Sequence, residues 1–77
     1  MKNIGKKLEI LKAIHNVYIE ELDLSGGATI KLLKAGIFKI SDMDWDRLQY
    51  TKGIGKATIS ELSAAIEKMY AENIPEI

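Results

Sequence analysis

The sequence predicts an all-α domain, a compact bundle of about four to five short helices. Apolar residues recur at three- and four-residue steps in successive segments, as they do along the buried face of a helix. No segment shows the alternation of apolar and polar residues that a strand would need. With 77 residues, the chain has room for one domain with a modest core.

Composition excludes several classes of protein. Hydrophobic residues make up 47% and charged residues 29%, which is unlike a disordered segment. There is no cysteine, which excludes disulfides and thiolate metal sites, and one histidine cannot form a metal cluster alone. We expect neither a metal nor a cofactor. No apolar run approaches the roughly 20 residues that span a bilayer, and the amino terminus lacks the apolar stretch of a signal peptide. We therefore expect a cytoplasmic protein with no membrane contact.

Charge and side-chain chemistry argue against an enzyme. The chain contains no Ser-His-Asp set, no carboxylate pair with a plausible cleft and no phosphate loop of the nucleotide-hydrolysing type. The single histidine, His15, lies beside the apolar stripe and is expected at the surface. Trp45 is expected to fill the core, and the alternative is a partly exposed anchor for a partner. Lys and Arg total 11 against 11 Asp and Glu, so any affinity for DNA must come from a local basic patch.

The first two helices follow from apolar spacing and from capping residues. A helix from residue 6 or 7 to residue 21 is predicted by the apolar face formed by Leu8, Leu11, Ile14, Tyr18 and Leu22. Ser25 then caps a second helix over residues 27–35. Its inner face is expected to contain Ile30, Leu33 and Ile37, with Leu32 also near the buried centre, and Gly36 ends it in the left-handed conformation.

The remaining helices occupy the second half of the chain. A capping box at residues 41–44, with Ser41 as the cap, predicts a short third helix. Its apolar face continues through Trp45, Leu48 and Tyr50 to about Thr51. The final helix has a clear helical period and must stop before Pro75, and its apolar residues are Ile59, Leu62, Ile66, Met69 and Tyr70.

A glycine-rich turn, Lys52-Gly53-Ile54-Gly55-Lys56, precedes the final helix. Two glycines around one apolar residue match the turn of a helix-hairpin-helix unit, in which Ile54 enters the core and backbone amides face outward. Those amides, together with the positive end of the following helix, can hold a phosphate. Lys52, Lys56 and the hydroxyl of Thr58 could add contacts to a DNA backbone. The alternative is that the glycines only form a sharp connection between two helices.

Several blocks occur in a fixed order along residues 19–70. They are Ile19-Glu20-Glu21-Leu22-Asp23-Leu24-Ser25, Leu32-Leu33-Lys34-Ala35-Gly36-Ile37, Ile40-Ser41-Asp42-Met43, Gly53-Ile54-Gly55-Lys56 and Ser60-Glu61-Leu62. With these blocks the chain resembles the carboxy-terminal domain of the bacterial RNA polymerase alpha subunit. The resemblance implies a domain over residues 19–72, preceded by an extra helix within residues 1–18 that packs on or flanks it, and followed by a tail over residues 73–77.

The resemblance also implies a DNA-binding surface. In that family, the start of the first domain helix and the hairpin grip the minor groove, chiefly through an arginine and an asparagine on that helix. This chain has Gly27 and Ile30 at those positions, so the remaining contacts are expected from Lys31 and from the hairpin. On the hairpin Gly55 and Glu61 agree with the family pattern, Thr58 stands for a serine, and Ala57 replaces a lysine.

A second surface follows from the same resemblance. Glu20, Glu21 and Asp23 fall on the acidic patch through which the family domain faces the sigma factor. The alternative for these three acids is a solvated helix end.

Two hypotheses follow from the sequence. The first is a transcription-associated module that contacts double-stranded DNA through Lys31, Lys52, Gly53, Gly55, Lys56 and Thr58. The second is a module that docks on RNA polymerase or sigma factor through Glu20, Glu21 and Asp23 without binding DNA. A bacterial or phage regulator and a homodimer through the amino-terminal helix are further hypotheses.

Overall fold

The computed structural model describes residues 3–74, and over this range it is an all-α bundle without strands. Its α-helices are α1 (Ile4–Ile14), α2 (Gly26–Lys34), α3 (Trp45–Leu48) and α4 (Lys56–Asn73). Two 3₁₀ turns, η1 (Ile19–Glu21) and η2 (Ile40–Asp42), connect them. The predicted fold class is confirmed. Pro75 lies outside the described residues, and α4 ends before it.

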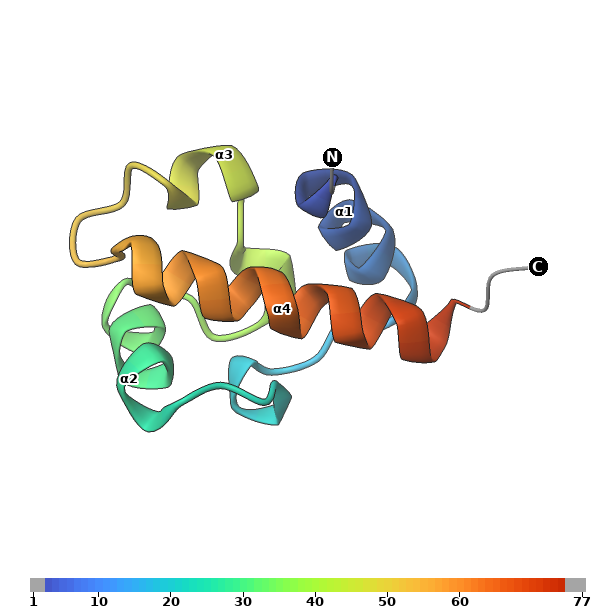
Figure 1. The fold of residues 1–77 in the computed structure, drawn as a ribbon, viewed down its shortest axis with the longest axis horizontal. Helices are drawn as coiled ribbons and strands as arrows, with labels where there is room; N and C mark the ends of the chain where they lie inside the picture. Colours follow the sequence, from blue (N-terminus) through green and yellow to red (C-terminus); the bar gives the residue numbers. More distant parts are fainter. Residues whose placement is uncertain (1–2, 75–77) are drawn as a thin grey trace.

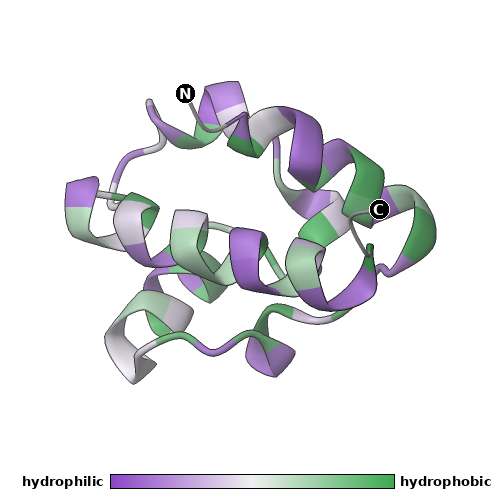
Figure 2. Cartoon of the chain, turned by 45° about the vertical axis from the view of Figure 1, so that its right-hand side comes forward, coloured by the Kyte–Doolittle hydropathy of each residue, from purple (hydrophilic) through white to green (hydrophobic). Residues whose placement is uncertain are grey.

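Helix α4 runs along the length of the molecule, and the other elements pack around it (Figure 1). Helices α1 and α3 lie on one side of α4 in this view, and α2 lies on the other side near the start of α4. Apolar residues of every element meet in one core, and Figure 2 shows hydrophobic and hydrophilic positions alternating along each helix. The largest fully buried side chains are Leu8, Leu11, Ile19, Leu32, Ile40, Met43, Leu48, Leu62 and Ile66.

The amino-terminal helix belongs to this core. Ile4, Leu8 and Leu11 of α1 are buried, and α1 packs against α4, α3 and η2. A homodimer through α1 stays a prediction, and it would have to use the opposite face of the helix.

The first helix is shorter than the sequence predicts, and the expected extension to residue 21 is wrong. α1 ends at Ile14, where the amide of His15 donates to the carbonyl of Leu11 at 2.7 Å. The chain is then extended, so that Val17 and Ile19 are buried while Tyr18 points outward with 54% of its surface exposed. An isolated antiparallel bridge between Tyr18 and Lys39 holds this segment.

The bridge explains why the helix stops. The amide of Ile19 donates to the carbonyl of Phe38 at 2.8 Å, and the amide of Ile40 donates to the carbonyl of Val17 at 3.0 Å. β-branched and aromatic residues such as Val17, Tyr18 and Ile19 favour extended backbone. These partners lie about twenty residues away in the chain, so helical periodicity alone could not reveal them.

Four residues assigned to apolar faces are exposed instead. Ile14 is 57% exposed, Tyr18 54%, Ile30 53% and Tyr50 90%. On α2 the buried positions are Ala28 and Leu32, and a residue midway between them points away from the core. Tyr50 follows Leu48 by two residues, a spacing that does not keep it on the same helical face.

Local capping confirms the predicted start and end of α2. The hydroxyl of Ser25 accepts a hydrogen bond from the amide of Ala28 at 3.2 Å. Gly36 has a φ of 84°, the left-handed conformation that glycine adopts without steric cost. The helix therefore begins and ends where residues of the expected type stand.

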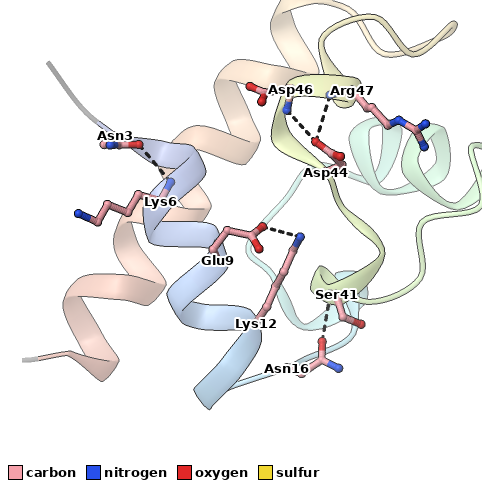
Figure 3. Close-up of polar contacts among 9 residues, drawn as sticks. All are labelled: Asn3, Lys6, Glu9, Lys12, Asn16, Ser41, Asp44, Asp46 and Arg47. Atoms are coloured by element: carbon pink, nitrogen blue, oxygen red, sulfur yellow. Dashed lines mark hydrogen bonds and ion pairs between the residues drawn. The ribbon is translucent and has the colours of Figure 1, made fainter.

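The capping box predicted at residues 41–44 is wrong in its cap. Asp44, not Ser41, caps α3, and its carboxylate accepts from the amides of Asp46 and Arg47 at 3.2 and 3.3 Å (Figure 3). Ser41 lies within η2, where its amide donates to the side chain of Asn16 at 3.1 Å (Figure 3). The contact ties the segment after α1 to η2.

Asp42 makes the stability of this region depend on pH. Its carboxylate accepts from the amides of Phe38 and Lys39, both at 3.0 Å. These hydrogen bonds, first that from Phe38, and the charge of Lys39 lower the pKa of Asp42 below its ordinary value of 3.8. Its contribution to stability is therefore present above pH 3.8 and is lost as the pH falls through the lower folded pKa.

We therefore expect Asp42→Asn to destabilise the protein near neutral pH and to have a shrinking effect in acid. Urea unfolding followed by circular dichroism between about pH 6 and about pH 2 measures the difference between the two proteins. Below about pH 4, the difference in unfolding free energy between the wild type and Asp42→Asn should disappear. A difference in unfolding free energy that stays constant over this range would contradict the role given to the carboxylate.

Candidate nucleic-acid interface

The glycine turn before α4 has the local geometry that the sequence predicts. The amide of Ile54 donates to the carbonyl of Thr51 at 3.1 Å, which closes the turn. Gly53 has a φ of 91°, so a residue with a side chain would be strained there. Ile54 is 7% exposed and packs in the core, as expected. One buried side chain thus anchors a turn whose flanking residues face solvent.

The start of α4 is open to a ligand. Gly55 occupies the cap position, no side chain accepts from the first helical amides, and the first turn contains no acidic residue. The 18-residue helix also places the positive end of its macrodipole there. Gly55 is exposed, and no other group lies within 4 Å of the position that a Cβ would take, so there is room for a ligand beside its backbone. Free amides and open space are what an anion needs at a helix amino terminus.

Two lysines flank this start. Lys52 and Lys56 are both exposed, on either side of Gly53 and Gly55. The turn therefore brings together four of the six residues predicted to contact DNA. These four residues lie close together because they are near neighbours in one tight turn.

Thr58 does not belong to this surface. Its residue is only 2% exposed, so its hydroxyl is not presented to a phosphate in solution. The spacing could have shown this, because Thr58 lies four residues before Leu62 on the buried face of α4. The contact assigned to Thr58 is therefore dropped.

Lys31 lies on a different element. It is exposed on α2, whose start is joined to α4 by Glu61. The carboxylate of Glu61 accepts from the amide of Ser25 at 2.9 Å and from its hydroxyl at 3.0 Å. Helix α2 and the start of α4 accordingly lie at the same end of the molecule (Figures 1 and 2). Gly27 and Ile30, which stand for the arginine and the asparagine of the resembling family, are exposed on α2.

Sequence reasoning missed two features beside the turn. A hollow of about 440 Å³ is lined by Gln49, Ile54, Gly55, Lys56, Ile59 and Ser60. Tyr50, next to Gln49 in the chain, has 90% of its surface exposed. The hollow forms between the segment after α3 and the first turns of α4, so no local pattern could indicate it.

The three acidic residues of the second hypothesis are all exposed, but two of them have partners within the protein. The carboxylate of Glu21 accepts from the amide of Tyr18 at 2.9 Å, and that of Asp23 lies 3.6 Å from the ammonium group of Lys68. Glu21 therefore has a local structural role in η1. Surface ion pairs such as Asp23–Lys68 contribute little to stability.

His15 and Trp45 lie outside this interface, within residues 3–74. This part of the chain contains no group of three His, Asp or Glu side chains that could hold a metal ion. His15 is exposed, and Trp45 is half-buried against the core, where it packs over Gly5. None of the described helices is both long and apolar enough to cross a membrane.

Comparison of the chain with protein-family models, with curated proteins and with solved structures gave no match. The resemblance to the RNA polymerase alpha carboxy-terminal domain therefore stays a prediction from the sequence blocks.

Proposed function

We propose that the protein is a small transcription-associated DNA-binding module that holds the phosphate backbone at the turn formed by residues 52–56. One observation carries the proposal. The amino terminus of α4 has no side-chain cap, is accessible at Gly55 and is flanked by the exposed Lys52 and Lys56. Backbone amides, helix amino termini and lysines are among the groups that contact phosphate oxygens in DNA complexes. The association with transcription rests on the sequence resemblance.

The charge of the chain sets the expected strength of binding. Net charge is zero, so long-range attraction is weak and only the local lysines neutralise phosphates. Two neutralised phosphates give a slope of about −1.8 in a plot of log affinity against log salt concentration. Affinity should then fall about twelvefold between 50 and 200 mM salt. Binding of this kind positions the protein on DNA without reading its sequence.

Lys56→Glu tests the proposal. A carboxylate in the first turn of α4 suits the helix dipole, so the variant should fold while repelling phosphate. We expect at least a tenfold loss of affinity for a short fluorescent duplex, measured by anisotropy at low salt, and a shallower salt slope.

Lys68→Glu is the matched control. It makes the same charge change twelve residues further along α4, about 18 Å from Lys56. Its DNA affinity should stay close to that of the wild type, and circular dichroism checks that both variants are folded. Equal affinity of Lys56→Glu and Lys68→Glu would refute phosphate binding at this turn.

Docking on RNA polymerase or sigma factor through Glu20, Glu21 and Asp23 stays a prediction of the resemblance. The hydrogen bond from Tyr18 gives one of these acids, Glu21, a structural role inside the protein, whereas the exposed ion pair of Asp23 with Lys68 contributes little. The open turn at Gly55 therefore supports the DNA-binding proposal more directly.

A further inference from the structure

We propose that the preferred DNA carries an unpaired base beside the bound phosphate, so that the protein binds single-stranded stretches in preference to intact duplex. The proposal rests on the proposed function and names its substrate class. It is carried by the hollow at the start of α4 and by the exposed ring of Tyr50.

The hollow and the phosphate position share residues. Gly55 and Lys56 begin α4 and also line the hollow. A phosphate held by the first amides of α4 therefore lies at the rim of the hollow, and the nucleoside attached to it can reach inside. At about 440 Å³, the hollow is within the range of sites that take small organic molecules.

The lining suits a nucleobase. Ile54 and Ile59 supply apolar wall, which suits the faces of a flat ring. Gln49 and Ser60 add polar side chains to the lining. The side-chain amide of Gln49 donates to the carbonyl of Trp45 at 3.4 Å, which leaves its oxygen to accept from an exocyclic amino group. In a duplex, pairing covers the Watson–Crick edge of each base and stacking covers its faces, so only an unpaired base can enter the hollow.

Tyr50 follows Gln49 in the chain, and we infer that its exposed ring stacks on a base of the same nucleic acid. Its ring is 90% exposed, yet its backbone is fixed, because its amide donates to the carbonyl of Arg47 at 3.0 Å. The next residue is fixed too, since the hydroxyl of Thr51 donates to the same carbonyl at 2.9 Å. An aromatic ring on a fixed turn, outside the core and between Gln49 and Lys52, matches the stacking platforms of proteins that bind single strands.

The experiment compares a fluorescent 12-nucleotide single strand with the corresponding duplex at the same salt concentration. The wild type should bind the single strand several-fold more tightly. Tyr50→Ala should weaken single-strand binding about tenfold and leave duplex binding unchanged, whereas Tyr50→Phe should retain both affinities. Tyr18→Ala is the matched control, since Tyr18 is also exposed but lies on the segment between α1 and η1.

Nuclear magnetic resonance locates the base. The single strand should shift the side-chain amide of Gln49 and the methyl groups of Ile59, and the duplex should not. Equal or tighter duplex binding, or an equal loss for both ligands in Tyr50→Ala, would overturn the inference. Unchanged single-strand binding in Tyr50→Ala would assign Tyr50 to another partner, such as a protein, and would overturn it as well.

Failure of the proposed function has a different signature. In that case Lys56→Glu would leave the affinity for both ligands unchanged. If Lys56→Glu weakens the binding of both ligands and Tyr50→Ala weakens the binding of neither, the proposed phosphate binding is retained and the inference of an unpaired base is rejected.

Discussion

Leu11→Ala is expected to lower the free energy of unfolding by about 2–5 kcal/mol, the usual cost of removing a fully buried leucine side chain. Leu11 is 1% exposed and lies where α1 joins the core. A chain of 77 residues has a total stability of about 4–12 kcal/mol. The variant should therefore show a strongly lowered urea midpoint.

The same helix offers the control for Leu11→Ala. Ile14 is three residues away and 57% exposed, so Ile14→Ala should change the free energy of unfolding by less than about 1 kcal/mol. Urea unfolding of both variants measures the two values. Equally small losses of unfolding free energy in the two variants would mean that α1 flanks the domain and is not part of its core.

Glu61→Ala is expected to cost about 1–3 kcal/mol of stability. The carboxylate of Glu61 accepts two hydrogen bonds from Ser25, across 36 positions of the chain, and Ser25 caps α2. Removing Glu61 leaves the amide and hydroxyl of Ser25 without this acceptor and frees the start of α2 from α4. Water reaches part of this contact, which favours the lower end of the range.

A double-mutant cycle isolates the contact. Glu61→Ala, Ser25→Ala and the double variant should show a coupling energy of at least about 0.5 kcal/mol, as residues in direct contact do. Glu72→Ala is the control, because Glu72 is an exposed acid on the same helix. Additive losses from Ser25→Ala and Glu61→Ala would show that the two residues stabilise the protein independently.

Several features could be predicted from the sequence because their causes are local. The helical period of α4, the Ser25 cap of α2, the left-handed Gly36 and the turn around Ile54 each depend on residues within a few positions of one another. Spacing and conformational preference are enough to specify such features. The same local causes let the sequence predict that one turn brings together Lys52, Gly53, Gly55 and Lys56.

The tertiary structure decided the rest, because it depends on contacts between distant segments. The antiparallel bridge between Tyr18 and Lys39 ends α1 early, and Glu61 fixes the start of α2 from 36 residues away. The hollow beside Gly55 exists only where the segment after α3 meets α4. By itself, the sequence determined the all-α class, the turn and its lysines. Only packing determined that α1 ends at Ile14 and that Val17 and Ile19 are buried in an extended segment, because the backbone partners of that segment lie about twenty residues away in the chain.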